Sequence, residues 1–261
     1  MVDDRVRALR ARFRRLHESG CFVLPNPWDI GSAQMLVQLG FPALASTSAG
    51  FAWSIGHRDN AITLDDALVH LRTLVAAVPV PVNADFEGGF AVDPEGVAAN
   101  VTRAVHTGVA GLSIEDSTGD ASDPLFPMSL AVERIAAARA AIDAVDPSTM
   151  LVGRCELFLT GRSDIDETVR RLQAYAAAGA DCLYAPGVKT GDEIAAIVQA
   201  VAPKPVNVVV NTPFTTVEEL ASLGVRRVSV GGALARAATG TASVAEARSL
   251  SARRRRAATP S

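Results

Sequence analysis

The stretch Pro81-Val82-Asn83-Ala84-Asp85-Phe86-Glu87-Gly88-Gly89 places a proline before a short β-type run and acidic residues at its end. A proline stops a helix and presets an extended backbone, so a strand is predicted directly after it, at residues 82–85. In a parallel barrel, acidic residues at the carboxyl end of a strand are candidates for the active site, because the active site lies at that end of the strands. Whether the chain forms such a barrel depends on how often this pattern recurs.

Short β-type runs alternate with helix-length, alanine-rich amphipathic segments along the whole chain. Eight strands are predicted, at residues 21–24, 43–46, 82–85, 111–114, 150–153, 182–185, 206–209 and 227–230. Strands two, four, six and eight follow a glycine that can end a helix in the left-handed conformation, at Gly40, Gly108, Gly179 and Gly224. Strands three, five and seven follow Pro81, Pro147 and Pro205. This repetition predicts an α/β fold, a (β/α)8 TIM barrel in a single domain, with an open doubly wound sheet as the alternative.

The chain has 261 residues, 49% of them hydrophobic, which suits one barrel domain. Residues 1–20 are assigned to an N-terminal segment. Its helix, at residues 5–17, is expected to cover the bottom or flank of the barrel. Its apolar face carries Val6, Leu9, Phe13 and Leu16, and its arginines are expected on a solvated face. The barrel is assigned to residues 21–246, and the arginine-rich residues 247–261 are expected to form a frayed tail.

Charge and cysteine content exclude several classes of function. A net charge of -3 gives no general attraction to nucleic acid or anionic lipid, so the expected partner is a small molecule. Cys21, Cys155 and Cys182 are widely spaced, which indicates a reducing compartment without structural zinc. No apolar run is long enough for a membrane span and no signal peptide is visible, so a cytoplasmic location is expected.

Acidic residues gather at the ends of two neighbouring strands. The two-residue alternation of a strand places Asp85 and Glu87 on one side of strand three, and Glu115 ends strand four. Three converging carboxylates would repel one another unless a hard cation with oxygen ligands lay between them. The pattern therefore predicts a metal site for Mg²⁺, with Mn²⁺ as a second possibility. A solvated loop or a helix N-cap is the structural alternative.

Strand five ends in Arg154-Cys155-Glu156, and alternation turns Arg154 and Glu156 inward and Cys155 outward. Arg154 then has two interpretations. It could form an internal ion pair with one of the acids, or its planar fork could hold the carboxylate or phosphoryl group of a substrate bound to the metal. We favour the second interpretation.

Two polar segments complete the predicted site. Ser46-Thr47-Ser48-Ala49-Gly50 offers hydroxyls and unhindered backbone N–H groups, which suit either an anion site or an ordinary capped loop. Asn207 lies within strand seven, where an inward-facing amide needs a partner such as a substrate oxygen. Ser46, Thr47, Ser48 and Asn207 are therefore candidates for binding the substrate.

Several motifs, in their order along the chain, resemble the isocitrate lyase/phosphoenolpyruvate mutase superfamily. The matching segments are Leu24-Pro25-Asn26-Pro27-Trp28-Asp29, Ser46-Thr47-Ser48-Ala49-Gly50, Gly56-His57-Arg58-Asp59, Ala84-Asp85-Phe86-Glu87-Gly88-Gly89, Ile114-Glu115-Asp116, Gly153-Arg154, Ala178-Gly179-Ala180-Asp181, Pro205-Val206-Asn207 and Leu223-Gly224-Val225-Arg226-Arg227-Val228-Ser229. The resemblance extends over about residues 24–238. A barrel of the ketopantoate hydroxymethyltransferase type shares fewer matches.

The resemblance implies a Mg²⁺-dependent barrel whose metal is held, directly or through water, by Asp85, Glu87 and Glu115. It further implies that a pyruvate-like or phosphonopyruvate-like substrate is surrounded by Thr47, Ser48, Asp59, Arg154 and Asn207. The shared chemistry that it implies is an enolate of a 2-oxo acid chelated to the metal. Family members associate through helices around the barrel, so a homotetramer or homodimer is expected.

The chain departs from the family pattern at two places. Residues 116–128, after strand four, contain no cysteine, lysine or histidine. The resemblance therefore argues against the thiol-dependent isocitrate and methylisocitrate lyase activities. It also argues against the phosphonate activities, which use a lysine and an asparagine in this loop. Glu87 replaces the commoner aspartate, which adds one methylene of reach.

The leading hypothesis is a Mg²⁺-dependent carbon-carbon lyase that acts on a small 2-oxo or 2-hydroxy carboxylate through a metal-bound enolate. Asp59, Arg154 and Glu156 are its predicted catalytic residues, and no cysteine is expected to take part. Tyr184, His57 or a metal-bound water could protonate the product. The alternatives are carbon-phosphorus chemistry of the mutase or hydrolase type, and a ligand-binding protein that has lost catalysis.

Overall fold

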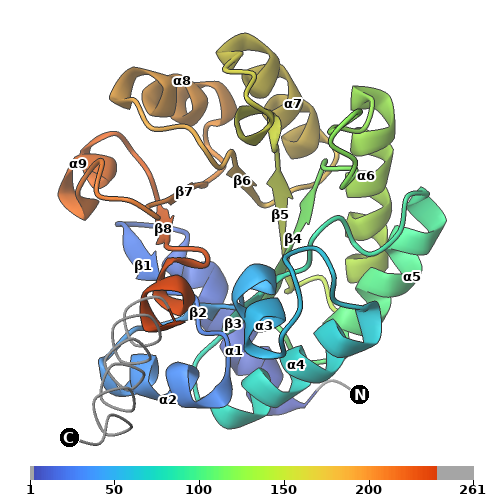
Figure 1. The fold of residues 1–261 in the computed structure, drawn as a ribbon, viewed down its shortest axis with the longest axis vertical. Helices are drawn as coiled ribbons and strands as arrows, with labels where there is room; N and C mark the ends of the chain where they lie inside the picture. Colours follow the sequence, from blue (N-terminus) through green and yellow to red (C-terminus); the bar gives the residue numbers. More distant parts are fainter. Residues whose placement is uncertain (1–2, 240–261) are drawn as a thin grey trace, which may run out of the picture.

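The computed structural model describes residues 3–239 and contains eight parallel strands surrounded by helices (Figure 1). The strands are β1 Phe22–Leu24, β2 Leu44–Ala45, β3 Val82–Asp85, β4 Gly111–Glu115, β5 Met150–Arg154, β6 Cys182–Tyr184, β7 Val206–Val209 and β8 Arg227–Ser229. They pair in the order β1-β8-β7-β6-β5-β4-β3-β2. Between β1 and β2 the barrel is joined by a backbone hydrogen bond from Ala45 N to Pro25 O, 3.0 Å long. The predicted (β/α)8 barrel is confirmed, and the open doubly wound alternative is wrong.

The helices follow the strands in the expected alternation. They are α1 Asp4–Leu16, α2 Ile30–Gln38, α3 Ser48–Ser54, α4 Leu64–Ala77, α5 Pro94–Val105, α6 Met128–Val145, the 3-10 helix Leu157–Thr160, α7 Ile165–Ala177, α8 Gly191–Val201 and α9 Val217–Ser222. The four glycines predicted to end helices before even-numbered strands all have positive φ, from 88° to 109°. None of the helices within residues 3–239 is both long and apolar enough to span a membrane. The predicted tail, residues 247–261, lies outside the described residues.

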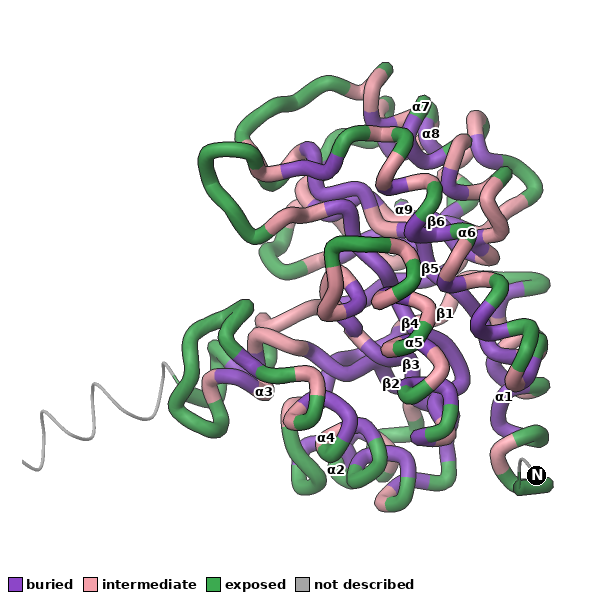
Figure 2. Tube along the Cα trace, turned by 90° about the vertical axis from the view of Figure 1, so that its right-hand side faces the viewer, coloured by how far each residue is buried: buried purple, intermediate pink, exposed green. Residues whose placement is uncertain are grey.

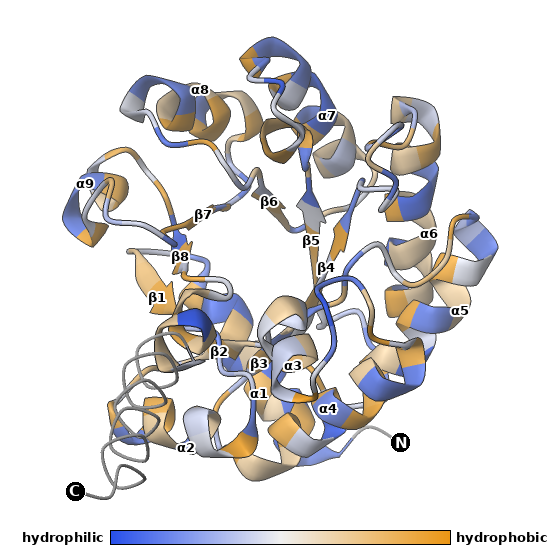
Figure 3. Cartoon of the chain, in the orientation of Figure 1, coloured by the Kyte–Doolittle hydropathy of each residue, from blue (hydrophilic) through white to orange (hydrophobic). Residues whose placement is uncertain are grey.

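The main apolar core lies between the strands and the surrounding helices, and a smaller apolar cluster fills the bottom of the barrel. Figure 3 shows hydrophilic colours on the outer turns of helices such as α7 and α8. In the bottom cluster, Phe13 of α1 packs against inward-facing residues such as Met150 and Val152. The lower end of the barrel is therefore closed, and polar residues that face inward gather at the other end.

Helix α1 lies at one end of the barrel, opposite the end that carries α3 (Figure 2). The expected solvated face of its arginines is wrong for Arg10, which is only 1% exposed. The Arg10 guanidinium donates to Val105 O and Val109 O, and it pairs with Asp146 at 2.6 Å. The carbonyls at the end of helix α5 need donors from outside the helix, and Arg10 supplies them.

Asn26 joins the three strands that meet where the barrel closes. Its Oδ1 accepts hydrogen bonds from the backbone N–H groups of Val230 and Gly231, both 2.9 Å long, and its Nδ2 donates to Ser46 O at 3.0 Å. The side chain is buried, so water cannot replace these bonds. Asn26 therefore holds the end of β1 to the ends of β2 and β8.

Replacement of Asn26 by alanine is expected to lower the free energy of unfolding by about 2–4 kcal/mol, since a buried hydrogen bond contributes about 1 kcal/mol and partners are left unsatisfied. Urea denaturation measures this change. Asn211→Ala is the matched control, because Asn211 is exposed on the neighbouring loop. Equal stability of the two variants would contradict the assigned role of Asn26.

Candidate active site

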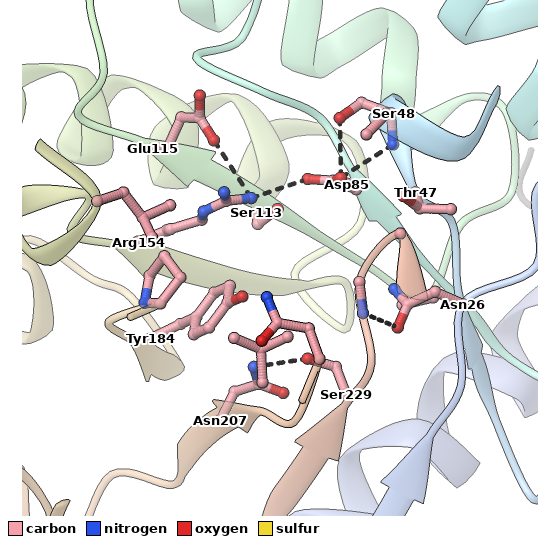
Figure 4. Close-up of a pocket in the computed structure, with 18 of the residues that line it drawn as sticks. Asn26, Thr47, Ser48, Asp85, Ser113, Glu115, Arg154, Tyr184, Asn207 and Ser229 are labelled. Atoms are coloured by element: carbon pink, nitrogen blue, oxygen red, sulfur yellow. Dashed lines mark hydrogen bonds and ion pairs between the residues drawn. The ribbon is translucent and has the colours of Figure 1, made fainter. Parts of the chain in front are cut away.

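The carboxyl ends of the strands surround a cavity of about 530 Å³, to which every strand of the barrel contributes a side chain. Figure 4 shows part of its polar lining. Nine of the ten predicted site residues line this cavity: Ser46, Thr47, Ser48, Asp59, Asp85, Glu115, Arg154, Glu156 and Asn207. Glu87 is the exception. The structure thus brings together residues that lie far apart in the sequence.

Arg154 lies at the centre of the acidic residues. Its Nη1 is 3.2 Å from Oδ1 of Asp85 and 3.2 Å from Oε2 of Glu115 (Figure 4). Its Nε donates to Glu156. Burial alone would lower the pKa of Arg154, but Glu156 and Glu115 raise it well above its ordinary value. The inward orientation of Arg154 and Glu156 is confirmed. The internal ion pair, which was the less favoured interpretation, is the arrangement seen, and contact of Arg154 with a substrate stays a prediction.

The segment 46–48 holds Asp85 from the neighbouring strand end. The backbone N–H and the hydroxyl of Ser48 both donate to Oδ2 of Asp85 at 2.9 Å, and the Asp85 N–H donates to Ser46 Oγ. Thr47 begins helix α3 as its N-cap and accepts from Gly50 N. Of the two interpretations of this segment, the structure favours the capped loop, whose hydroxyls fix the orientation of a carboxylate.

The remaining acids lie in surroundings that disfavour their charge. Burial raises the pKa of Glu115 well above its ordinary value, opposed by Arg154 and reinforced by Glu156 and Asp85. Burial also raises the pKa of Glu156, against the opposing effect of Arg154. The single guanidinium of Arg154 therefore does not fully compensate the negative charge of this cluster, which favours an additional cation or bound protons.

Glu87 does not share a side with Asp85, and the sequence-based expectation is wrong here. The strand ends at Asp85, and Glu87 has a φ of 47°, so the two-residue alternation no longer applies. Its side chain lines a neighbouring cavity of about 300 Å³, which Glu115 and Ser117 line as well. Burial, then Asp85 and Asp59, raise the pKa of Glu87 to about 7.

The acids near the strand ends supply oxygen donors, the type of ligand that the predicted divalent cation binds. Oε1 of Glu87 is buried and has no hydrogen-bond partner among the described residues. The nearby carboxylates Asp85 and Glu115 are oxygen donors, as Mg²⁺ prefers. Within residues 3–239, however, no three His, Cys, Asp or Glu side chains are grouped so that they could hold a metal ion as they lie. The positive partner that Asp85 and Glu115 share in this structure is Arg154.

Asp116 positions the site from outside the cavity. Its carboxylate is buried and accepts from the backbone N–H of Glu156 at 2.8 Å, from Arg171 at 3.1 Å and from the Tyr175 hydroxyl at 2.6 Å. The following loop folds back as an antiparallel bridge between Ser117 and Leu125. This network anchors both the end of β5 and the loop after β4.

Sequence reasoning missed several residues that line the cavity, namely Asn26, Trp53, Asn83, Ser113, Lys189, Asn211, Arg227, Ser229 and Arg236. Lys189 could have been found, because it closely follows the end of strand six. Of the two side chains considered as proton donors, Tyr184 lines the cavity. His57 is instead exposed, with its Nδ1 3.2 Å from Ala61 O.

Asn207 has partners within the protein. Its Nδ2 donates to Ser229 Oγ at 3.0 Å, and its Oδ1 accepts from Arg227 Nε at 2.8 Å. Figure 4 shows the bond between Asn207 and Ser229. The amide therefore does not need a substrate oxygen to complete its hydrogen bonds. Contact of Asn207 with the substrate stays a prediction.

None of the cysteines offers a thiolate to the cavity. Cys155 is buried in the core behind the strands, as alternation predicted, and burial raises its pKa. Cys182 faces the apolar bottom of the barrel, and burial raises its pKa too. The Cys155→Ala and Cys182→Ala variants are expected to keep kcat within about twofold, because only a thiolate near the substrate would act. Loss of turnover in Cys155→Ala with an unchanged unfolding temperature would contradict this assignment.

The sequence profile of the family described as Phosphoenolpyruvate phosphomutase matches residues 13–250. An uncharacterised protein of Mycobacterium tuberculosis is 34% identical over 84% of this chain and 81% of its own length. An oxaloacetate decarboxylase of Rhodopseudomonas palustris is 32% identical over 87% of this chain and 77% of its own length.

Three crystal structures are similar over most of both chains. A Burkholderia cenocepacia protein, described provisionally as a lyase or mutase, is 48% identical with a TM-score of 0.90 over 98% of this chain and 95% of the other. 2,3-Dimethylmalate lyase is 26% identical with a TM-score of 0.83 over 98% and 89%. Oxaloacetate acetylhydrolase in complex with oxalate is 29% identical with a TM-score of 0.80 over 88% and 83%. With its motifs, its barrel and its acidic cavity, this chain belongs to the phosphoenolpyruvate mutase/isocitrate lyase superfamily of lyases and mutases.

Proposed function

We propose that this protein is a divalent-metal-dependent carbon-carbon lyase acting on a small 2-oxo or 2-hydroxy carboxylate. The observation that carries the proposal is the cluster of Asp85, Glu115, Glu156 and Arg154 in one cavity at the carboxyl ends of the strands. Two relatives support the choice of bond, since an oxaloacetate decarboxylase and an oxaloacetate acetylhydrolase are both similar to this chain. A carbon-phosphorus reaction finds less support, because the loop at residues 116–128 lacks lysine.

In the proposed reaction, Asp85, Glu115 and Glu87 would hold the metal, directly or through water. The bound cation would stabilise the negative charge that develops on the substrate oxygen, an effect worth several kcal/mol. Arg154 holds the substrate carboxylate, since a guanidinium fork matches two carboxylate oxygens. Ser46 and Ser48 keep Asp85 in place through the hydrogen bonds that they already make to it.

When a 2-oxo acid is the substrate, breaking the carbon-carbon bond leaves its electron pair on the carbon next to the oxo group, as an enolate. When a 2-hydroxy acid is the substrate, its hydroxyl loses a proton and becomes the new oxo group, and the electron pair stays on the carbon of the departing carboxylate. That carbon then needs a proton. Tyr184 is the better of the two side-chain candidates because it lines the cavity, and burial raises the pKa of its hydroxyl. The phenol is therefore protonated at neutral pH and able to donate. His57 does not line the cavity.

A screen of 2-oxo and 2-hydroxy acids with Mg²⁺, followed by ¹H NMR, tests the proposal. The expected result is release of a 2-oxo acid product from at least one member, abolished by a chelator. Phosphonopyruvate in the same panel, read by phosphate release, tests the carbon-phosphorus alternative. Binding without turnover across the whole panel would favour the non-catalytic alternative and contradict the proposal.

A further inference from the structure

Arg227 is a buried cation without an acidic partner among residues 3–239. The residue is 3% exposed and begins β8. Its Nε donates to Oδ1 of Asn207 at 2.8 Å, and its Nη1 lies 3.4 Å from Oδ1 of Asn83. Burial lowers the pKa of Arg227, and no carboxylate among the described residues acts to raise it. Both of its side-chain neighbours are neutral amides, so its positive charge is not compensated within the described part of the chain.

An uncompensated guanidinium in the barrel interior carries a desolvation cost. Two other buried arginines pair with acids, Arg10 with Asp146 and Arg171 with Asp116. A third, Arg134, donates to backbone carbonyls, and the nearby Asp116 and Glu115 raise its pKa against the effect of burial, whereas no carboxylate does so for Arg227 within residues 3–239. Arg227 differs from these three in a second way, since it lines the cavity of the candidate active site. Its Nη2 makes no hydrogen bond within residues 3–239, whereas Nε and Nη1 are bound. This arrangement leaves a donor available to an anion in the cavity.

The register of the sheet relates Arg227 to Arg154. Arg227 lies opposite Asn207, Asn207 opposite Tyr184, and Tyr184 opposite Arg154. Residues opposite one another present their side chains to the same face of a sheet, so these four line one wall of the cavity. Figure 4 shows Tyr184 between Arg154 and Asn207. Burial raises the pKa of Tyr184, and the guanidinium groups of Arg154 and Arg227 both lower it. Both positive charges therefore lie close enough to the Tyr184 hydroxyl to affect it.

The two arginines lie at different depths. Arg154 is the last residue of β5, whereas Arg227 is the first residue of β8. Strands β5 and β8 are separated by three strand-to-strand spacings of about 4.8 Å each, so the backbones of the two arginines lie about 14 Å apart along the barrel wall. Arg154 is thus near the mouth with the acids, and Arg227 is near the floor with neutral amides. The cavity between them has a positive group at each end.

We propose that Arg227 is a specificity-determining residue that binds the distal carboxylate of a dicarboxylate substrate. This inference rests on the proposed function for the reacting end, which lies near Arg154. Asn207 positions the guanidinium, because its own amide is fixed by Ser229. The substrate class is then a 2-oxo or 2-hydroxy dicarboxylate, and a monocarboxylate would leave the buried charge of Arg227 unpaired.

Calorimetric titration with succinate and with pyruvate tests this inference without turnover, so it is separable from the lyase proposal. Arg227→Met is expected to weaken succinate binding at least about tenfold and to change pyruvate binding less than about twofold, since only succinate carries a second carboxylate. Arg162→Met is the matched control, because it removes an equal charge from an exposed loop. It is expected to bind both acids as the wild type does.

Asn207→Asp keeps the test decisive if Arg227→Met folds poorly. The new carboxylate would lie within hydrogen-bond distance of Arg227 and compensate its charge internally, so the variant should be at least as stable as the wild type. It is nevertheless expected to weaken succinate binding at least about tenfold more than pyruvate binding, because only the second carboxylate of succinate competes with the new carboxylate for Arg227. Unchanged succinate binding in either variant would overturn the inference. Equal weakening of succinate and pyruvate would also overturn it, since that result indicates a structural role for Arg227.

Discussion

Asp85→Ala is expected to lower kcat by at least about a thousandfold, equivalent to about 4 kcal/mol of lost transition-state stabilisation. Asp85 interacts with three other site residues, Ser46, Ser48 and Arg154. It accepts two hydrogen bonds from Ser48 and pairs with Arg154, and its charge acts on Glu87 and Glu115. Its loss therefore removes a predicted metal ligand and one anchor of Arg154 together.

The same variant is expected to fold at least as stably as the wild type when no metal is present. Asp85 raises the pKa values of Glu87 and Glu115, so its removal relieves repulsion among buried acids. Urea denaturation and calorimetric titration with MgCl₂ separate the two effects. Asp192→Ala, an exposed acid in the first turn of α8, serves as the control and should keep full activity. Unchanged Mg²⁺-dependent activity in Asp85→Ala would disprove the assigned site.

Arg154→Lys is expected to raise KM for the 2-oxo acid by about ten- to a hundredfold, which corresponds to about 1.4–2.8 kcal/mol. Arg154 directs Nη1 and Nε at different acids, and a lysine ammonium keeps the charge but loses the planar fork. The substitution therefore acts on the group that is proposed to hold the substrate carboxylate. Steady-state kinetics with the substrate found in the screen measure the change.

Arg171→Lys distinguishes this effect from loss of an internal ion pair. Arg171 also pairs with a buried acid, Asp116, but it does not line the cavity. This control is expected to lower the unfolding temperature and to leave KM unchanged. If Arg154→Lys behaves in the same way, Arg154 serves only the internal ion pairs seen in the structure.

The fold could be predicted because its signals are local and repeated. Residues 82–85 and 206–209 were predicted with the bounds that the structure has, since a proline precedes each strand and fixes where it begins. The bounds of the other six strands differ from the predicted ones by one residue, at one end in five of them and at both ends in β2. The α1 arginines were misjudged because an amphipathic pattern identifies a polar face without showing what covers it. Backbone carbonyls of distant segments cover Arg10.

The site could be predicted only where its geometry follows from strand alternation. Asp85, Glu115, Arg154 and Glu156 lie within or just beyond their strands, and all four line the cavity as expected. Glu87 lies beyond its strand in a left-handed conformation, which a sequence pattern does not reveal. Arg227 was missed for another reason: its role depends on the register between β7 and β8, which sets it against Asn207.

This cavity is proposed to stabilise the enolate of a 2-oxo acid, and exchange of the pyruvate methyl protons in D₂O measures that step directly by ¹H NMR. With Mg²⁺ present, we expect exchange with the wild-type protein to be at least about a hundredfold faster than with Asp85→Ala, because the lost group stabilises the developing charge. Exchange at one common rate for the wild type, Asp85→Ala and buffer alone would contradict it.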